Sequence, residues 1–210
     1  MTTDSGPHVS RPRGRGSCGA VVEPIAHERS ALFGACFAFG RPDIFVTAAH
    51  VVTAGRDRGA QALHVIGPGV DLTFVETVRC HPEQDLAVLF APGAEADPFR
   101  AVLDPEPSVR AHLAAWRGGR REECSTTVCG EAVQVAPPEC AYRFEAFALA
   151  DAPGRAFSGA AVVSDGGGVF GVLTHTARRH GLEWGVALRL ASAFDWLEQV
   201  LDDIERSVPA

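Results

Sequence analysis

The chain has 210 residues, of which 46% are hydrophobic and 21% are charged, and its formal net charge is −7. This length allows one domain, or one domain with two lobes, with a substantial buried core. The negative charge gives no electrostatic reason to expect a nucleic-acid partner, and no apolar run approaches the roughly 20 residues that span a bilayer.

The N-terminal residues 1–17 combine Thr, Ser, Gly, Pro and Arg with almost no apolar side chains. This composition is typical of a disordered tail, in which we expect Arg11, Arg13 and Arg15 to be solvated. The segment also lacks the charged and then apolar pattern of a secretory signal. We therefore expect a cytoplasmic protein whose folded domain covers residues 18–210.

Short apolar segments separated by Gly and Pro turns follow from Cys18 onward, and they predict β-strands. The predicted strands are residues 31–39, 44–47, 62–66, 72–78, 86–90, 126–135, 142–148, 160–163, 168–174 and 183–188. Residues 109–116 form a further short apolar segment, whereas residues 97–107 are loop-like and residues 118–125 are polar. About a dozen short strands are typical of an all-β sandwich or a pair of β-barrels.

The C-terminal segment has a helical periodicity instead. Apolar residues recur there at steps of three and four along one stripe, at Leu190, Phe194, Leu197, Leu201 and Ile204. This pattern predicts an amphipathic helix over about residues 191–206. Ser192 and Asp195 resemble an N-capping pair. We expect the helix to pack against the β-core.

The chain contains six cysteines: Cys18, Cys36, Cys80, Cys124, Cys129 and Cys140. In a cytosolic chain of this size, reduced thiols are expected rather than three disulfides. The spacing of the last three cysteines, with His112 nearby, fits no usual zinc motif. We therefore predict no metal site and no cofactor.

Three residues in separate stretches have side chains that can cooperate in nucleophilic catalysis. His50 follows a predicted strand, Asp85 precedes one, and Ser158 lies between small, turn-permitting residues beside Gly159. Alone, each is more often a structural histidine, a turn-capping aspartate or an ordinary Ser-Gly turn. Together they supply a nucleophile, a base that takes its proton and a carboxylate that orients the base.

The order His, Asp, Ser along the chain is that of the chymotrypsin-type scaffold, whereas α/β-hydrolases and subtilisins have other orders. The local motifs resemble those of trypsin-like serine endopeptidases, in particular the compact bacterial branch related to HtrA (Deg) proteases. Thr47-Ala-Ala-His50 resembles the histidine motif, Asp85-Leu-Ala-Val-Leu89 the aspartate motif and Phe157-Ser-Gly-Ala-Ala-Val162 the serine motif. Gly171-Val-Leu-Thr174 and Trp184-Gly-Val-Ala-Leu188 are similar to the two strands that follow.

This resemblance implies two six-stranded antiparallel β-barrels, with the site in the cleft between them. His50 would be the general base, Asp85 its orienting carboxylate and Ser158 the nucleophile. We expect the hydroxyl of Ser158 to lie within hydrogen-bond reach of the His50 imidazole, with Asp85 on the other ring nitrogen. The backbone N–H groups of Ala156 and Ser158 would form the oxyanion hole, where such a donor contributes about 3 kcal/mol.

Two departures from the family pattern lie next to the serine. Ala156 stands where the family usually has Gly, so a positive φ would cost on the order of 1 kcal/mol there. Phe157 replaces the Asp that pairs with a newly cut N-terminus in trypsin. We therefore expect no activation by N-terminal cleavage.

The resemblance also places a substrate-binding pocket near Asp151 and Ala152, and three alternatives remain open. Asp151 at the base of the pocket would favour Arg or Lys. Ala152 with Thr174 would form a small apolar pocket. His175 or Thr176 would hydrogen-bond an acidic side chain.

We predict a serine endopeptidase that hydrolyses peptide bonds of a protein or peptide substrate through an acyl-enzyme, either alone or as a module of a larger regulatory or effector system. Neither nucleic acid nor a membrane is an expected partner. A pseudoprotease or latent protease that uses the cleft to bind protein is the alternative, because Ala156 and Phe157 could hold the oxyanion loop shut. The complete His–Asp–Ser set argues against it. Hydrolysis of a non-peptide ester is a third possibility.

Overall fold

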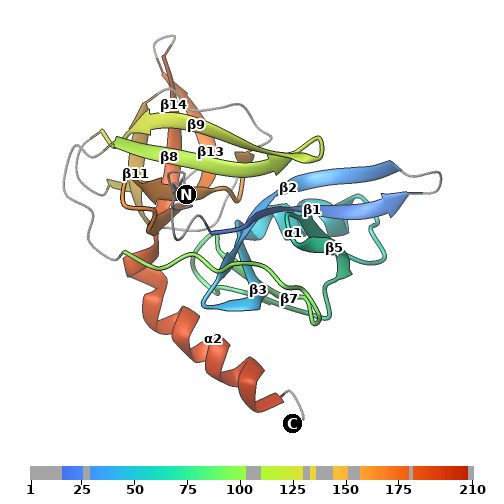
Figure 1. Cartoon of the computed structure of the whole chain (residues 1–210). Helices are drawn as coiled ribbons and strands as arrows, with labels where there is room; N and C mark the ends of the chain where they lie inside the picture. Colours follow the sequence, from blue (N-terminus) through green and yellow to red (C-terminus); the bar gives the residue numbers. More distant parts are fainter. Residues whose placement is uncertain are drawn as a thin grey trace, which may run out of the picture.

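Two antiparallel sheets of seven strands each account for most of the described chain (Figure 1). The structure is a computed structural model, and it describes residues 16–25, 29–102, 110–129, 133–135, 144–150, 157–179 and 182–207. The strands of the N-terminal sheet are β1 (Cys18–Ile25), β2 (Arg29–Phe39), β3 (Arg41–Thr47), β4 (His64–Gly67), β5 (Val70–Phe74), β6 (Thr77–Cys80) and β7 (Ala87–Phe90). Those of the C-terminal sheet are β8 (Arg110–Arg117), β9 (Arg120–Thr127), β10 (Val133–Val135), β11 (Phe144–Ala150), β12 (Ala161–Ser164), β13 (Val169–Arg179) and β14 (Leu182–Arg189).

Each sheet is formed by consecutive strands of the chain, so the molecule has an N-terminal and a C-terminal lobe (Figure 1). The spatial orders are β5-β4-β1-β2-β3-β7-β6 and β10-β11-β14-β13-β12-β8-β9. Helix α1 (Ala49–Asp57) lies between β3 and β4, and the 3₁₀ turn η2 (Leu190–Ala193) leads into α2 (Phe194–Ser207). No helix in the described part of the chain has the length and apolar character that a membrane span requires.

The predicted all-β fold with two antiparallel lobes and a C-terminal helix is confirmed, although each sheet has seven strands rather than six. Residues 72–78 were expected as one strand but are divided between β5 and β6. The division occurs because the N–H of Val75 donates to Leu63 O and that of Glu76 donates to Phe90 O, at 2.9 Å each. The residues before Val75 therefore pair with β4, and the residues after Glu76 pair with β7.

The polar segment 118–125 belongs mostly to β9, which pairs with β8 through a turn at Gly118 and Gly119. β9 is at the edge of its sheet, and most of its side chains are at least partly exposed. Because such a strand buries few side chains, it can form from polar residues without an apolar pattern in its sequence. Strand β1 and helix α1 were not predicted. The expected tail over residues 1–17 falls almost entirely outside the described residues.

The C-terminal helix begins at Phe194 rather than near residue 191. The predicted capping role of Ser192 is wrong, because this residue lies within η2 and its hydroxyl donates to the carbonyl of Arg189 at 2.8 Å. The apolar stripe of the helix was predicted correctly, since Leu197 and Ile204 are buried.

One core cluster joins both lobes to α2 and is called here the interlobe cluster. Its members include Phe37, Ile44 and Leu86 of the N-terminal lobe, Val172 and Leu188 of the C-terminal lobe, and Leu197, Val200 and Ile204 of α2. The helix follows the C-terminal lobe in sequence, yet it lies along the N-terminal lobe near β3 and β7 (Figure 1). Each lobe also has a core cluster of its own.

The five cysteines among the described residues are free thiols, and Cys140 lies outside this part of the chain. Cys18 and Cys36 are buried. Burial raises the pKa of the Cys18 thiol to about 12 and that of Cys36 well above its usual range. Protonated, enclosed thiols of this kind are chemically inert.

Candidate active site

The position of His50 follows from an abrupt change from strand to helix. β3 ends at Thr47, the extended residue Ala48 is the N-cap, and α1 begins at Ala49, so His50 lies in the first helical turn. The first N–H groups of a helix have no acceptor within it, and Ala48 has no side chain that could cap them. An acceptor for these groups must therefore come from elsewhere in the fold.

Asp85 lies in the turn that connects β6 to β7. The turn is closed by a hydrogen bond from the N–H of His81 to Leu86 O at 2.8 Å. The N–H of Glu83 donates to Nδ1 of His81 at 3.1 Å, and that of Leu86 to Gln84 O at 2.8 Å. Asp85 is only 1% exposed, so its carboxylate depends on hydrogen bonds from the protein.

Both carboxylate oxygens of Asp85 accept hydrogen bonds from His50. Oδ1 accepts from the backbone N–H at 2.9 Å, and Oδ2 lies 2.7 Å from Nδ1 of the ring. An ionised carboxylate is only an acceptor, so Nδ1 carries the proton and Nε2 is left as the basic nitrogen. The same carboxylate therefore caps α1, where the helix dipole also favours negative charge, and fixes the tautomer of the histidine.

Ser158 lies in a turn that is held from both lobes. Its carbonyl accepts the N–H of Ala35 from β2 at 2.7 Å. The N–H of Gly159 donates to Leu173 O of β13 at 2.7 Å, and the ring of Phe157 is buried in the core cluster of the C-terminal lobe. These contacts fix the backbone of the turn against both sheets.

Two glycines make this close approach possible. Gly159 has φ +87°, and a Cβ at this position would overlap the carbonyl oxygen of Ala35 and the hydroxyl of Thr47. A Cβ on Gly34 would lie 2.5 Å from Cγ2 of Val51 and 2.8 Å from the carbonyl oxygen of Ser158. Val51 follows His50 directly in α1. The structure therefore brings the start of α1 and the serine turn to the same place.

The hydroxyl of Ser158 does not bond to the histidine in this resting arrangement. It donates to the carbonyl of Thr174 at 3.2 Å, and no hydrogen bond joins it to His50 within the described ranges. The expected direct contact is thus absent, because the single hydroxyl proton is directed to Thr174. The backbone N–H of Ser158 has no acceptor among the residues that the structure describes.

The remaining predicted site residues have different positions. Thr174 is fully buried, and its hydroxyl bonds to Val186 O and to Nδ1 of His175, at 2.9 Å each, so its side chain does not line an open pocket. His175 and Thr176 follow it on β13 and are half-buried. Three predicted residues, Asp151, Ala152 and Ala156, lie outside the described residues.

A second Ser–His–Asp set lies on the surface of the C-terminal lobe. Nε2 of His112 is 3.0 Å from Oδ1 of Asp165, and Nδ1 is 3.5 Å from Oγ of Ser125. The side chain of Asp165 is 63% exposed, in contrast to the buried Asp85. Solvent screens such an exposed pair, so this set lacks the fixed carboxylate of the first. The sequence places His112 only near cysteines. It does not indicate this set, because Ser125 and Asp165 are 13 and 53 positions away from His112 along the chain.

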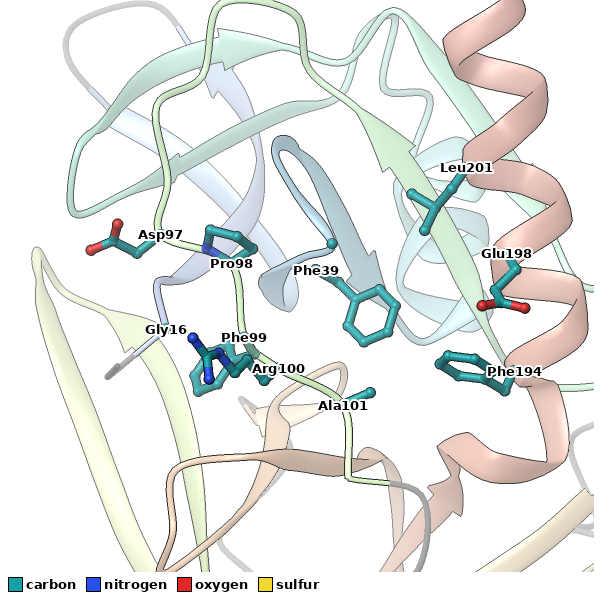
Figure 2. Close-up of a pocket in the computed structure, with 11 residues that line it drawn as sticks. Gly16, Phe39, Asp97, Pro98, Phe99, Arg100, Ala101, Phe194, Glu198 and Leu201 are labelled. Carbon is teal, nitrogen blue, oxygen red and sulfur yellow. The ribbon is translucent and has the colours of Figure 1, made fainter. Parts of the chain in front are cut away.

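A cavity of about 740 Å³ lies between α2 and residues 97–101, which precede the C-terminal lobe. Figure 2 shows Phe194, Glu198 and Leu201 projecting from α2 toward Phe39 across this cavity. His50, Asp85 and Ser158 do not line it. It is therefore separate from the candidate active site.

Comparison with known proteins relates the chain to peptidases. Residues 34–172 match the family model described as a trypsin-like peptidase domain. No curated protein sequence matches the chain. Among solved structures, the Rv3671c protease from M. tuberculosis in its active form has a TM-score of 0.71 at 19% identity, with 88% of this chain and 80% of that chain covered.

Two further solved structures have the same fold. The HtrA-type protease AlgW with a tripeptide has a TM-score of 0.72 at 17% identity, with 91% of this chain and 62% of that chain covered. The MamO protease domain from Magnetospirillum magneticum has a TM-score of 0.69 at 15% identity, with 87% of this chain and 94% of that chain covered. At these identities the likeness establishes the fold.

Replacing Gly159 with alanine tests the fit of the serine turn. A left-handed backbone costs an alanine about 1–2 kcal/mol, and overpacking typically adds about 1–3 kcal/mol. We expect the free energy of unfolding, measured by urea denaturation, to fall by about 2–5 kcal/mol. Gly93→Ala is the matched control, because Gly93 has φ +86° and a Cβ at this position would have no atom within 4 Å. Equal losses in the two variants would contradict the proposed fit.

The pKa of His81 predicts how stability depends on pH. Burial lowers this pKa from its usual value of 6.5, and the carboxylate of Glu83 acts in the opposite direction. Below pH 6.5 the unfolded chain therefore binds a proton more readily than the folded chain, so stability falls as the pH falls toward the folded pKa. His81→Gln removes this contribution. The free energy of unfolding should decline less steeply from about pH 7 to about pH 5 in this variant than in wild type; equal slopes would contradict the assignment.

Proposed function

The chain belongs to the trypsin-like peptidase domain family, and from this premise we propose that it is a serine endopeptidase with His50, Asp85 and Ser158 as its catalytic triad. The observation that carries the proposal is the paired hydrogen bonding of a buried Asp85 to His50, beside a serine turn held from both lobes. A module that only bound protein would have no chemical need for a histidine with a fixed tautomer and a basic Nε2.

The proposed reaction has two halves. Oγ of Ser158 attacks the carbonyl carbon of the peptide bond while Nε2 of His50 accepts its proton, and the Asp85 carboxylate stabilises the imidazolium. His50 then transfers the proton to the leaving nitrogen, the C–N bond breaks and the acyl group remains on Ser158. In the second half, a water molecule gives a proton to His50 and attacks the ester carbon. The proton then passes to Ser158 as the carboxylic acid departs.

The hydroxyl of Ser158 must first leave the carbonyl of Thr174. A rotation about the Cα–Cβ bond moves it to another staggered position without any change in the backbone. A neutral hydrogen bond of this kind contributes a net free energy of about 1 kcal/mol. Breaking it therefore adds little to the activation free energy of an enzyme reaction. The bond from Ala35 to the carbonyl of Ser158 can persist throughout, because it does not involve the side chain.

The oxyanion hole that we propose uses the N–H groups of Ser158 and Ala156. The N–H of Gly159 donates to Leu173 O and that of Ala160 to Phe157 O, so neither is available to a substrate. In the described part of this turn, the N–H of Ser158 is therefore the one that we assign to the substrate oxygen. A donor of this kind contributes about 3 kcal/mol to stabilisation of the transition state.

Proteins or peptides are the substrate class that we propose. The solved AlgW structures contain a tripeptide or a decapeptide, and AlgW has the same fold as this chain. His175 and Thr176 remain candidate substrate contacts, because they follow Thr174, whose carbonyl touches the nucleophile. An acidic substrate side chain remains the chemistry that His175 or Thr176 would recognise.

Covalent labelling with a fluorophosphonate probe tests the nucleophile. Wild type should be labelled, because the probe reacts with an activated serine, and His50→Ala should slow labelling on the order of 10⁶-fold, as loss of the triad histidine does. Ser158→Ala should abolish labelling. The rate of covalent attachment is measured by intact mass spectrometry.

Ser125→Ala is the matched control, because Ser125 belongs to the other Ser–His–Asp set and is exposed. The Ser125→Ala variant should be labelled at the wild-type rate. A signal that persists in Ser158→Ala and disappears in Ser125→Ala would assign the reactivity to the surface set. A folded wild-type protein that is not labelled would favour the binding module over the peptidase.

A further inference from the structure

The turn that carries Asp85 is in contact with α2, a helix from the other end of the chain. The imidazole ring of His81 and the indole of Trp196 meet edge to face, with ring centroids 4.9 Å apart and an interplanar angle of 63°. Nε2 of Gln84 donates to the carbonyl of Ser192, just before α2, at 3.2 Å. The turn is therefore bonded to the C-terminal segment at two of its residues.

The hydrogen bonds of His81 reach the residues on both sides of Asp85 in the turn. The backbone N–H of His81 bonds to Leu86 O and its Nδ1 accepts the N–H of Glu83, so this residue contacts the turn on both sides of Asp85. Leu86, which follows Asp85, is fully buried in the interlobe cluster with Leu197 of α2. A displacement of His81 would thus displace the carboxylate.

Trp196 lies on one flank of α2, away from the cavity. At 100° per residue, Phe194, Glu198 and Leu201 lie within one narrow stripe, and these are the residues that face the cavity in Figure 2. Leu197, Val200 and Ile204 form the adjacent buried stripe. Trp196 lies on the far side of this buried stripe, so the indole can be changed without altering the cavity flank.

We propose that Trp196 is a positioning residue for the catalytic carboxylate: acting through His81, its indole fixes the turn that holds Asp85 against His50. Gln84 assists through its bond to Ser192. This inference rests on the proposed function, since it gives α2 a part in the action of the triad. A catalytic group displaced by about 1 Å can lose about 100-fold in rate, so a support of this kind matters even far from the substrate.

The test compares Trp196→Ala with variants that separate positioning from general stability. Trp196→Ala should lower the rate of fluorophosphonate labelling about 10- to 100-fold. Trp196→Phe, which retains an aromatic ring against His81, should restore most of the rate. Gln84→Ala removes the bond to Ser192 at a half-buried position outside the core, so it should also lower the labelling rate. It tests the same positioning role if Trp196→Ala folds poorly.

Leu201→Ala is the matched control on the cavity flank of the same helix, where Leu201 packs against the interlobe cluster. It should lower the melting temperature while the labelling rate stays within about twofold of wild type. An equal loss of rate in Leu201→Ala and Trp196→Ala, at comparable loss of stability, would overturn the positioning role. So would wild-type labelling rates in both Trp196→Ala and Gln84→Ala.

Hydrogen exchange of the His50 backbone amide gives a readout that needs no catalysis. Within the described chain, Asp85 is the acceptor of this N–H, at 2.9 Å. Exchange of the His50 amide proton, followed by NMR on the full chain, should be faster in Trp196→Ala than in Leu201→Ala. If wild type were not labelled, the proposed function would fail, yet this amide would still test the positioning of Asp85. Unchanged exchange in Trp196→Ala would overturn the inference on its own.

Discussion

One backbone hydrogen bond, from the N–H of Ala35 to the carbonyl of Ser158, joins the two lobes at the candidate nucleophile. Other features follow from it: Gly34 and Gly159 lack side chains because the strand and the turn approach too closely for a Cβ. Ala35 itself packs in the core cluster of the C-terminal lobe. Since β2 also leads through β3 to α1, the same contact places the serine beside the start of the helix that carries His50.

Asp85 explains why a helix can begin where it does and why its histidine can act as a base. A small-residue run with no capping side chain would leave the first N–H groups of α1 without acceptors. The carboxylate of Asp85 supplies one acceptor and at the same time receives the Nδ1 proton of His50. Stability of α1 and the tautomer required for catalysis therefore depend on one buried carboxylate, which α2 helps to hold in place.

The sequence predicted the final helix from a helical stripe and most strands from short apolar runs, because these signals are local, and the family resemblance predicted the two lobes. The sequence also indicated His50, Asp85 and Ser158 as candidate site residues from their short local motifs. It did not predict α1, because Ala49–Asp57 has few apolar residues and its cap comes from Asp85, 35 positions later. It also placed the Ser158 hydroxyl on His50, whereas a carbonyl sixteen positions later in sequence accepts it. The contact between Trp196 and His81 is likewise non-local, so no pattern near either residue indicates it.

In the proposed mechanism, the contact between the lobes fixes the backbone of Ser158, so that catalysis needs only a rotation of its side chain. A crystal structure of the full chain with a peptide boronic acid bound covalently tests this most directly. We expect boron on Oγ of Ser158, the hydroxyl turned away from Thr174, and the bond from Ala35 to the carbonyl of Ser158 retained near 2.7 Å. A boronate on another residue would rule out Ser158 as the nucleophile, and a Ser158 turn separated from Ala35 would rule out a fixed backbone.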